Sequence, residues 1–164
     1  MSSHLTPRLA PLDPGHPDAR VLIAQSEALA SSLYPAESNH FEPPDGLRAP
    51  LGAFWGCWLG DTLVGCGGVK HLAPADGPSY GEIKRLFVSE SARGRGVAKM
   101  LMVRLEGELL ARGVRLARLE TGILQPEAIG LYKRLGYREC QPFGDYVVDP
   151  LSVFFERVLQ PPAP

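Results

Sequence analysis

The sequence predicts a single α+β domain in which a mixed, mostly antiparallel sheet is flanked by helices. The chain has 164 residues, of which 45% are apolar and only 21% charged. This is the length and hydrophobicity of one globular domain with a sizeable core, so a second domain is not expected. The predicted elements follow in the order helix, hairpin, strand, helix, strand, helix, strands, which gives one central βαβ crossover.

The first half of the chain contains one predicted helix and three predicted strands. Residues 17–33 read as an amphipathic helix, because apolar residues recur on one face after an initial Pro and Asp. Gly60-Asp61 joins two of the strands as a hairpin. The sixteen prolines gather near the ends and in connections, which we interpret as boundaries and loops. Segments rich in apolar, aromatic and β-branched residues predict the strands, at 53–59, 62–72 and 80–89.

The second half begins with a glycine-rich turn at 93–96. Apolar residues at 97, 101, 105 and 109 then recur every fourth position, which is typical of a helix packed on a sheet, and Gly113 ends it. A further helix has Pro126 in its first turn and Gly136 after its end. The remaining predicted segments are a strand at 114–121, that helix at 126–135, and closing strands near 137–140 and 151–159.

Composition excludes several classes of function. The formal net charge of -1 gives no overall electrostatic attraction to nucleic acid, so no nucleic-acid partner is expected. The three cysteines form no CxxC pair and are odd in number, so we expect neither a disulfide framework nor a metal site. No signal peptide and no apolar stretch of about 18 residues is found, so no membrane partner is expected. A cytoplasmic protein is the corresponding expectation.

The turn between the third strand and the next helix has the features of an anion site. A helix start leaves backbone N–H groups unpaired and carries partial positive charge, and glycine lets a phosphate approach closely. The P-loop pattern GxxxxGK[ST] is absent, and a dinucleotide fingerprint would need glycine where Lys99 stands. Nine basic residues between 84 and 118 also favour a phosphate-rich ligand, although ordinary solvated helix surface is the alternative. We expect the anion to be bound by the turn and the helix start, at Arg93, Gly94, Arg95, Gly96, Val97, Ala98 and Lys99.

Two motifs resemble those of the Gcn5-related N-acetyltransferase (GNAT) superfamily. Arg93, Gly96 and Ala98 fit [Q/R]-x-x-G-x-[G/A], which resembles the pyrophosphate-binding loop of that family. Residues 125–137, QPEAIGLYKRLGY, are similar to its N-x-x-A-x-x-L-Y-x-x-x-G-[F/Y] segment, with Gln125 where Asn is usual. The resemblance covers roughly residues 53–157.

The resemblance implies a GNAT-like acyl-CoA N-acyltransferase fold that spans residues 1–164. An acceptor-side part would cover about 1–75, an acetyl-CoA-binding core about 80–137, and C-terminal strands about 137–159. It implies acetyl-CoA as the acyl donor, with no metal, and contact of Gln125 with the pantetheine arm. It also implies that Leu86, Phe87 and Val88 lie on a bulged strand whose backbone binds pantetheine and polarises the thioester carbonyl.

The chemistry needs a base and an acid. An alkyl amine with a pKa of about 10.4 must lose a proton before it attacks a thioester. Glu82 matches the position of the family's carboxylate base, with an exposed strand-end carboxylate as the alternative. Tyr132, whose reference pKa is about 10, matches the acid that protonates the leaving thiolate, with a core tyrosine as the alternative. Cys57 and Cys66 lack a local His partner, so buried strand cysteines are favoured over an acyl-enzyme route.

The acceptor side is less specified by the sequence. Tyr34, Asn39 and His40 follow the first helix, in a loop that the family places at the acceptor site, although plain surface polarity is the alternative. Five acidic loop residues make a cationic or polyamine acceptor plausible: Glu37, Glu42, Asp45, Asp145 and Asp149. The leading hypothesis is acetyl transfer to the primary amine of a small molecule. The alternatives are acetylation of a protein lysine or N-terminus, and a non-catalytic acyl-CoA-binding module. Exposed sheet edges make a homodimer possible.

Overall fold

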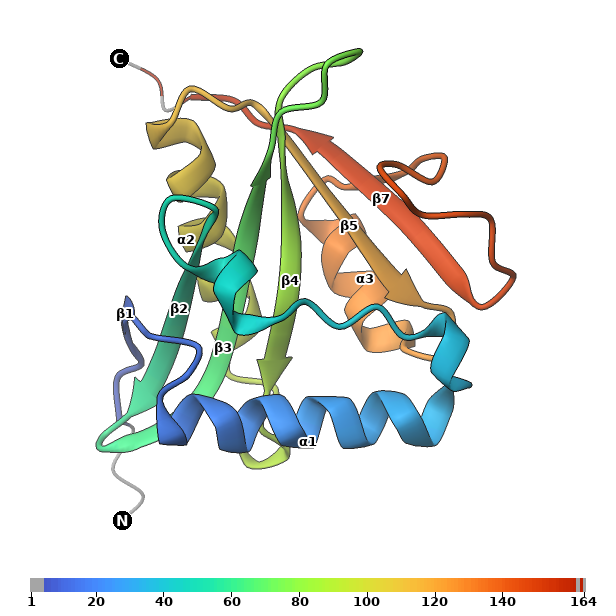
Figure 1. The fold of residues 1–164 in the computed structure, drawn as a ribbon. Coiled ribbons are helices and arrows are strands. Elements are labelled where there is room, and N and C mark those ends of the chain that lie inside the picture. The colour runs from blue at the N-terminus through green and yellow to red at the C-terminus, as the bar shows by residue number, and fades with distance from the viewer. Residues whose placement is uncertain (1–4, 162, 164) are drawn as a thin grey trace.

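The computed structural model describes residues 5–161 and 163, which form one sheet with helices on both faces (Figure 1). The sheet has seven strands in the order β1-β2-β3-β4-β5-β7-β6. All neighbours pair antiparallel except β4 and β5, which are parallel. The strands are β1 (Arg8–Pro11), β2 (Gly52–Leu59), β3 (Thr62–Leu72), β4 (Tyr80–Val88), β5 (Leu116–Gly122), β6 (Arg138–Glu139) and β7 (Ser152–Val158).

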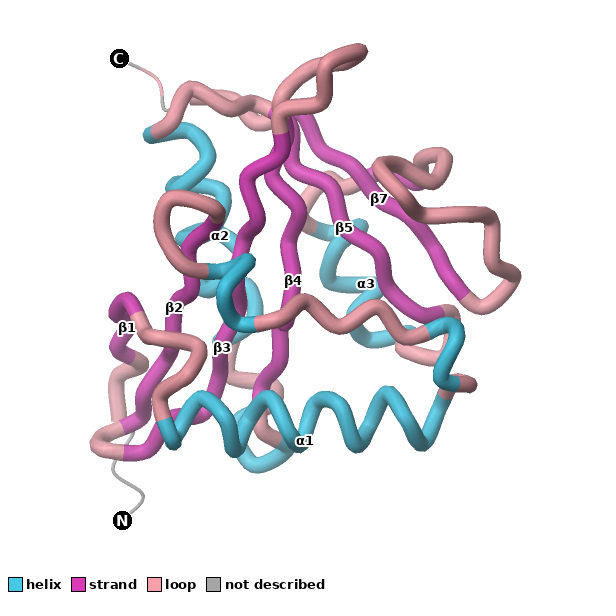
Figure 2. Tube along the Cα trace, in the orientation of Figure 1, coloured by secondary structure: helices cyan, strands magenta, loops and turns pink. Residues whose placement is uncertain are grey.

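The helices divide between the two faces of the sheet. One face carries α2 (Val97–Ala111) and α3 (Pro126–Arg134), while α1 (Pro17–Leu33) crosses the other face near the start of β3 and the end of β4 (Figure 1). The segment after α1 passes over that same face as a largely irregular loop, shown in Figure 2. It contains the short 3₁₀ helices η1 (Ala36–Ser38) and η2 (Pro44–Leu47), and a third, η3 (Glu90–Ala92), follows β4. The predicted α+β class and the central crossover, β4-α2-β5, are therefore confirmed.

Each face of the sheet has its own core. On the α2 and α3 face, Leu105, Leu109 and Phe155 are fully buried together with residues of β3, β4 and β5. On the α1 face, a smaller cluster joins Leu22 to Phe54 and other buried residues. The apolar side chains that recur every fourth position in α2 therefore face the sheet, as the sequence predicts.

One strand was not predicted. β1 contains Pro11 and follows Pro7, residues that we interpreted as loop, but Arg8–Pro11 pairs antiparallel with β2. The interpretation was wrong here because β1 is an edge strand, where a proline without an N–H removes no hydrogen bond from a neighbour. The other helices and strands lie within two residues of their predicted bounds, and Gly60 turns the hairpin with a φ of 60°.

A buried ion pair ties α2 to β7. Glu106 on α2 is 6% exposed, and Arg157 on β7 donates from Nη1 to both of its carboxylate oxygens at 3.0 Å. The hydroxyl of Tyr137 donates to the same carboxylate at 2.8 Å. Because every partner is satisfied, the carboxylate can remain inside the protein.

Candidate active site

A gap between β4 and β5 opens the middle of the sheet. The two strands are paired at only two positions, Gly81 with Ala117 and Glu82 with Arg118. Beyond these pairs they diverge, and the gap widens toward the end of the sheet at which α1 lies (Figure 1). Since β3 and β7 occupy the outer sides of the two strands, the facing sides are left without a strand partner and can serve a ligand.

β4 is bulged where it borders the gap. Its register against β3 shifts between Cys66 and Gly68, and Arg85 has a φ of 60°, a value that is uncommon for a residue other than glycine. The guanidinium of Arg85 holds this conformation: it donates to the Glu42 carbonyl at 3.0 Å and pairs with Glu27 of α1 at 2.8 Å. The bulge expected at residues 86–88 is therefore centred slightly earlier, at Arg85.

The glycine turn lines the larger of two cavities at the gap. This cavity, of about 590 Å³, lies between the end of β4, the start of α2, α3 and the last turn of α1. Of the residues that the sequence assigns to cofactor binding, Arg95 is exposed and absent from the wall. The others lie together on it: Leu86, Phe87, Val88, Arg93, Gly94, Gly96, Val97, Ala98, Lys99 and Gln125.

The start of α2 gives this cavity an electropositive end. Gly94 and Gly96 have φ values of 80° and 77°, so the turn depends on glycine at both positions. Gly96 is also the N-cap of α2, and because it has no side chain, the first N–H groups of the helix are left open for a ligand. Arg93 steadies the turn by donating to the Val88 carbonyl at 3.3 Å. Open N–H groups, the helix dipole and Lys99 together suit a pyrophosphate.

A second, smaller cavity of about 170 Å³ lies under the segment that follows α1. Tyr34, Asn39 and His40, the residues expected at the acceptor, all lie on its wall. The buried Tyr34 hydroxyl accepts the Leu124 N–H at 3.1 Å and donates to Gln125 Oε1 at 3.4 Å. Tyr34 therefore connects the acceptor side with the residue expected to meet pantetheine.

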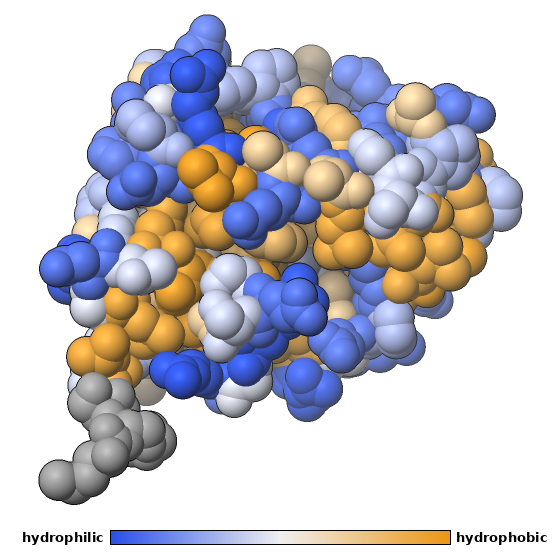
Figure 3. All heavy atoms as spheres, turned by 90° about the horizontal axis from the view of Figure 1, so that it is seen from below, coloured by the Kyte–Doolittle hydropathy of each residue, from blue (hydrophilic) through white to orange (hydrophobic). Residues whose placement is uncertain are grey.

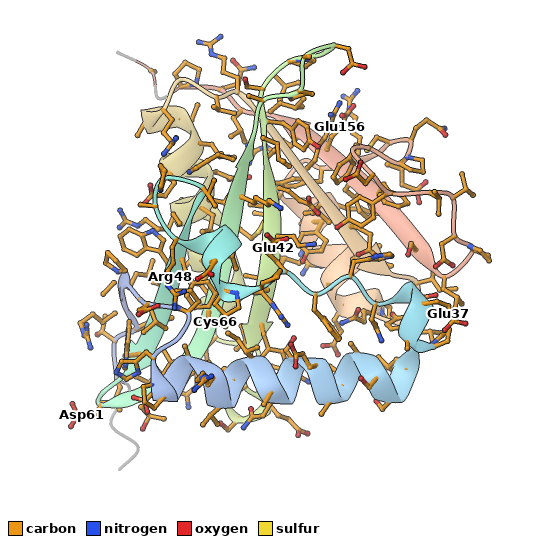
Figure 4. The ribbon with its side chains drawn as sticks, viewed as in Figure 1. Glu37, Glu42, Arg48, Asp61, Cys66 and Glu156 are labelled. Carbon is orange, nitrogen blue, oxygen red and sulfur yellow. The ribbon has the colours of Figure 1, made fainter. Side chains whose placement is uncertain are left out.

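An ion pair holds the covering segment onto the sheet. Glu42 lies on this segment, in front of the strands in Figure 4, and pairs with Lys70 of β3 at 3.0 Å. The underside of the molecule, where α1 lies, mixes apolar and polar side chains (Figure 3). Residues 38–42 of this segment form part of the wall of the smaller cavity.

Tyr132 lies where the two cavities meet. It contributes to both walls, from the face of α3 that packs on the sheet, and it is 7% exposed. Burial, followed by the charge of Glu120, raises the pKa of the Tyr132 phenol, so the side chain stays protonated at neutral pH. The alternative, that Tyr132 is a core tyrosine, agrees with its packing, because the ring also lies near Phe155. Its shared position on both walls is the feature that packing alone does not require.

Glu82 is buried, and one of its carboxylate oxygens, Oε2, has two partners. It is 6% exposed, so the alternative of an exposed strand-end carboxylate is wrong. Tyr146 donates its hydroxyl to Glu82 at 2.5 Å, and the Lys84 ammonium lies 3.4 Å from the same oxygen. Lys84 in turn donates to Tyr146 at 2.8 Å and to the His40 carbonyl at 3.1 Å. Glu82 therefore organises the loop residues next to the cavity.

Two residues of this region were missed by the sequence analysis. Tyr146 comes from the loop before β7, and only the folded chain brings it to Glu82. Glu120 lies on β5 and on the wall of the smaller cavity. The alternation of β5 places Arg118 and Glu120 on the face opposite the buried Ala117 and Leu119, but it does not show that this face borders a cavity.

The described part of the chain also shows where the cysteines lie and whether it contains metal-ligand clusters or membrane-spanning helices. Cys57 and Cys66 are buried strand residues, as predicted, and burial raises the pKa of the Cys66 thiol to about 12. Over residues 5–161 and 163, no three His, Cys, Asp or Glu side chains cluster as metal ligands would. Within the same residues, no helix is both long and apolar enough to cross a bilayer.

Known proteins show the same fold and related sequences. The profile of the Acetyltransferase (GNAT) family matches residues 22–137. The IAA acetyltransferase of Azospirillum brasilense is 40% identical over 138 residues, which cover 84% of this chain and 88% of that one. The uncharacterized N-acetyltransferase YsnE of Bacillus subtilis (strain 168) is 39% identical over 129 residues, covering 77% and 83% of the two chains.

Solved structures agree with these relatives. A Klebsiella pneumoniae protein assigned as an acyl-CoA N-acyltransferase superposes with a TM-score of 0.77 at 30% identity, covering 94% of this chain and 98% of that one. The PaiA N-acetyltransferase of Thermoplasma acidophilum, solved with coenzyme A, shares the fold with a TM-score of 0.70 at 15% identity over 94% of this chain and 99% of its own. The chain therefore belongs to the GNAT acetyltransferase family and is an acyl-CoA-dependent N-acetyltransferase.

Proposed function

We propose that this enzyme transfers the acetyl group of acetyl-CoA to the primary amine of a small molecule by direct attack. The observation that carries the proposal is the position of Tyr132 on the walls of both cavities. The larger cavity would hold the cofactor, with its pyrophosphate at the start of α2 and its pantetheine arm along the bulged end of β4. The smaller cavity would hold the acceptor, so that amine and thioester meet beside Tyr132.

A carboxylate on the acceptor side takes the proton of the amine. Glu82 is the candidate from the sequence, and Glu120 is a second carboxylate close to it. As the tetrahedral intermediate collapses, Tyr132 donates to the departing sulfur. Because its pKa is raised, the phenol is a weak acid, and it stabilises the developing thiolate through a hydrogen bond at least as much as by proton transfer. A small acceptor is supported by the size of its cavity, about 170 Å³ against about 590 Å³.

The test is an acetylation assay with a defined panel. Purified enzyme is incubated with acetyl-CoA and with amino acids, polyamines, arylalkylamines, short lysine peptides and IAA, the molecule named in the Azospirillum relative. Products are identified by mass spectrometry. We expect an acetylated small amine, and a decrease in kcat of about 10²-fold in Tyr132→Phe with little change in acetyl-CoA binding. Products from the peptides alone, or undiminished turnover by Tyr132→Phe, would contradict the proposal.

A further inference from the structure

Glu120 is a carboxylate on the wall of the acceptor cavity that forms no ion pair with a described residue. It belongs to β5, and Lys84 of β4 lies on the same wall. Its hydrogen bond comes from the Ser152 hydroxyl at 2.9 Å. Arg118, two residues earlier on the same face, is bound to Glu156 at 3.1 Å and stacks over Tyr80, so it does not serve Glu120.

The other carboxylates around this cavity are already neutralised. Glu42 is paired with Lys70, and Glu82 with Lys84. The cation Arg85 is paired with Glu27. Among the residues that the structure describes, the ion pairs do not include Glu120. The cavity therefore contains one uncompensated negative charge, which a protonated amine would balance.

The surroundings of Glu120 suit a base. Burial raises the pKa of its carboxyl above the ordinary value of 4.5, toward the range in which a carboxylate removes protons efficiently at neutral pH. The groups that face it are the Ser152 hydroxyl, His40 and Lys84, which oppose the rise, and Glu82, which adds to it. By contrast, the Glu82 carboxylate already receives the Tyr146 hydroxyl and the Lys84 ammonium.

We propose that Glu120 is the catalytic base: its carboxylate binds the ammonium group of the acceptor and takes its proton. This inference rests on the proposed acetyl transfer. The freed amine nitrogen attacks the thioester carbonyl carbon, and the C–S bond breaks as Tyr132 donates a proton to the leaving sulfur. The second proton of the nitrogen restores the Tyr132 phenol, and Glu120 releases the first proton to solvent, so the products are the acetylated amine, CoA thiol and one proton. Glu82 is then a positioning residue that holds Tyr146 and Lys84 at the cavity. The acceptor is an amine that arrives protonated.

Fluorinated amines test this assignment. Ethylamine, 2-fluoroethylamine and 2,2-difluoroethylamine are nearly equal in size, but each fluorine lowers the pKa of the amine, so a growing fraction is neutral and needs no base. For each amine, kcat/KM is measured from a concentration series at fixed neutral pH for wild type, Glu120→Gln and Glu82→Gln. Glu139→Gln, an exposed residue of β6, is the matched control for the amide substitution. Thermal unfolding and acetyl-CoA binding show whether each variant is folded.

A base role for Glu120 predicts a graded loss. In Glu120→Gln, kcat/KM should fall about 10²- to 10³-fold with ethylamine, and by a smaller factor with each added fluorine. Glu82→Gln should lose the same factor with all three amines. A uniform loss in Glu120→Gln, or a graded loss in Glu82→Gln, would overturn the assignment and leave acetyl transfer intact. Binding of acetyl-CoA without transfer by the wild type to these amines or to any of the panel would overturn the proposed function itself.

Discussion

Replacing Arg157 with methionine should expose how strongly the buried ion pair holds α2 to β7. The substitution removes both hydrogen bonds from Nη1 to the Glu106 carboxylate, each 3.0 Å long. Only the Tyr137 hydroxyl then remains on that carboxylate. Methionine fills a similar volume, so packing changes little and the effect reports the charge left behind.

The magnitude follows from the burial of the two partners. Breaking a fully buried pair costs about 3–5 kcal/mol, because an uncompensated charge remains inside the protein. The Glu106 side chain is only 8% exposed, but that of Arg157 is 33% exposed, so water can enter where the guanidinium was. We therefore expect the free energy of unfolding to fall by about 2–3 kcal/mol, below the range for a fully buried pair.

Urea unfolding at neutral pH, followed by circular dichroism, measures this free energy. The midpoint should decrease while the denaturant slope stays constant, since a change in slope would indicate an altered unfolded or native state. The double variant Glu106→Gln with Arg157→Met should recover much of the loss, because a neutral amide can still accept from Tyr137. A loss under about 1 kcal/mol, or a double variant as unstable as the single one, would refute the reasoning.

Three further substitutions probe the site. Gly96→Ala places a side chain at a φ of 77°, so the free energy of unfolding in urea should fall by about 1 kcal/mol. CoA binding, measured by calorimetry, should also weaken. The control Gly107→Ala, within α2, should not destabilise the protein. Tyr34→Phe leaves the Leu124 N–H without its acceptor, so the free energy of unfolding should fall by about 1 kcal/mol. The KM for acetyl-CoA should rise. If neither value changes, the hydrogen bond from Leu124 to Tyr34 has no role in stability or binding. Glu120→Gln should raise Tm at neutral pH, because a folded pKa above 4.5 means that the ionised carboxylate destabilises the fold. This gain should shrink as the pH falls toward 4.5, and a gain that grows on acidification would contradict the shift.

The helices, the strands and the conformation of the glycine turn could be predicted because their signals are local. The hairpin at Gly60, the Pro17 start of α1 and the apolar repeat of α2 each depend on a few neighbouring residues. The glycine turn carries its own backbone requirement at Gly94 and Gly96. The structure gathers these residues on one wall, as the motif implies.

The acceptor side could not be predicted in the same way because its contacts join distant parts of the chain. Glu82 and Tyr146 are 64 residues apart in the sequence, and the loop that carries Tyr146 has no pattern of its own. Glu120 reads as an ordinary polar residue of an alternating strand. Only the order of the strands shows that its face borders a cavity and not solvent.

The two paired positions at the narrow end of the gap are the point about which the two halves of the sheet can rotate relative to each other. Strands β1 to β4 and strands β5 to β7 meet there, with Gly81 so close to α2 that an added Cβ would lie 2.2 Å from Leu109. From Glu82 to the end of β4 is about 20 Å at ~3.3 Å per residue. A rotation of about 3° at this pivot moves the far end by about 1 Å, an error that can cost 10²-fold in rate. Substitutions of Gly81 or Ala117 should therefore change the width of the gap and with it the alignment of donor and acceptor.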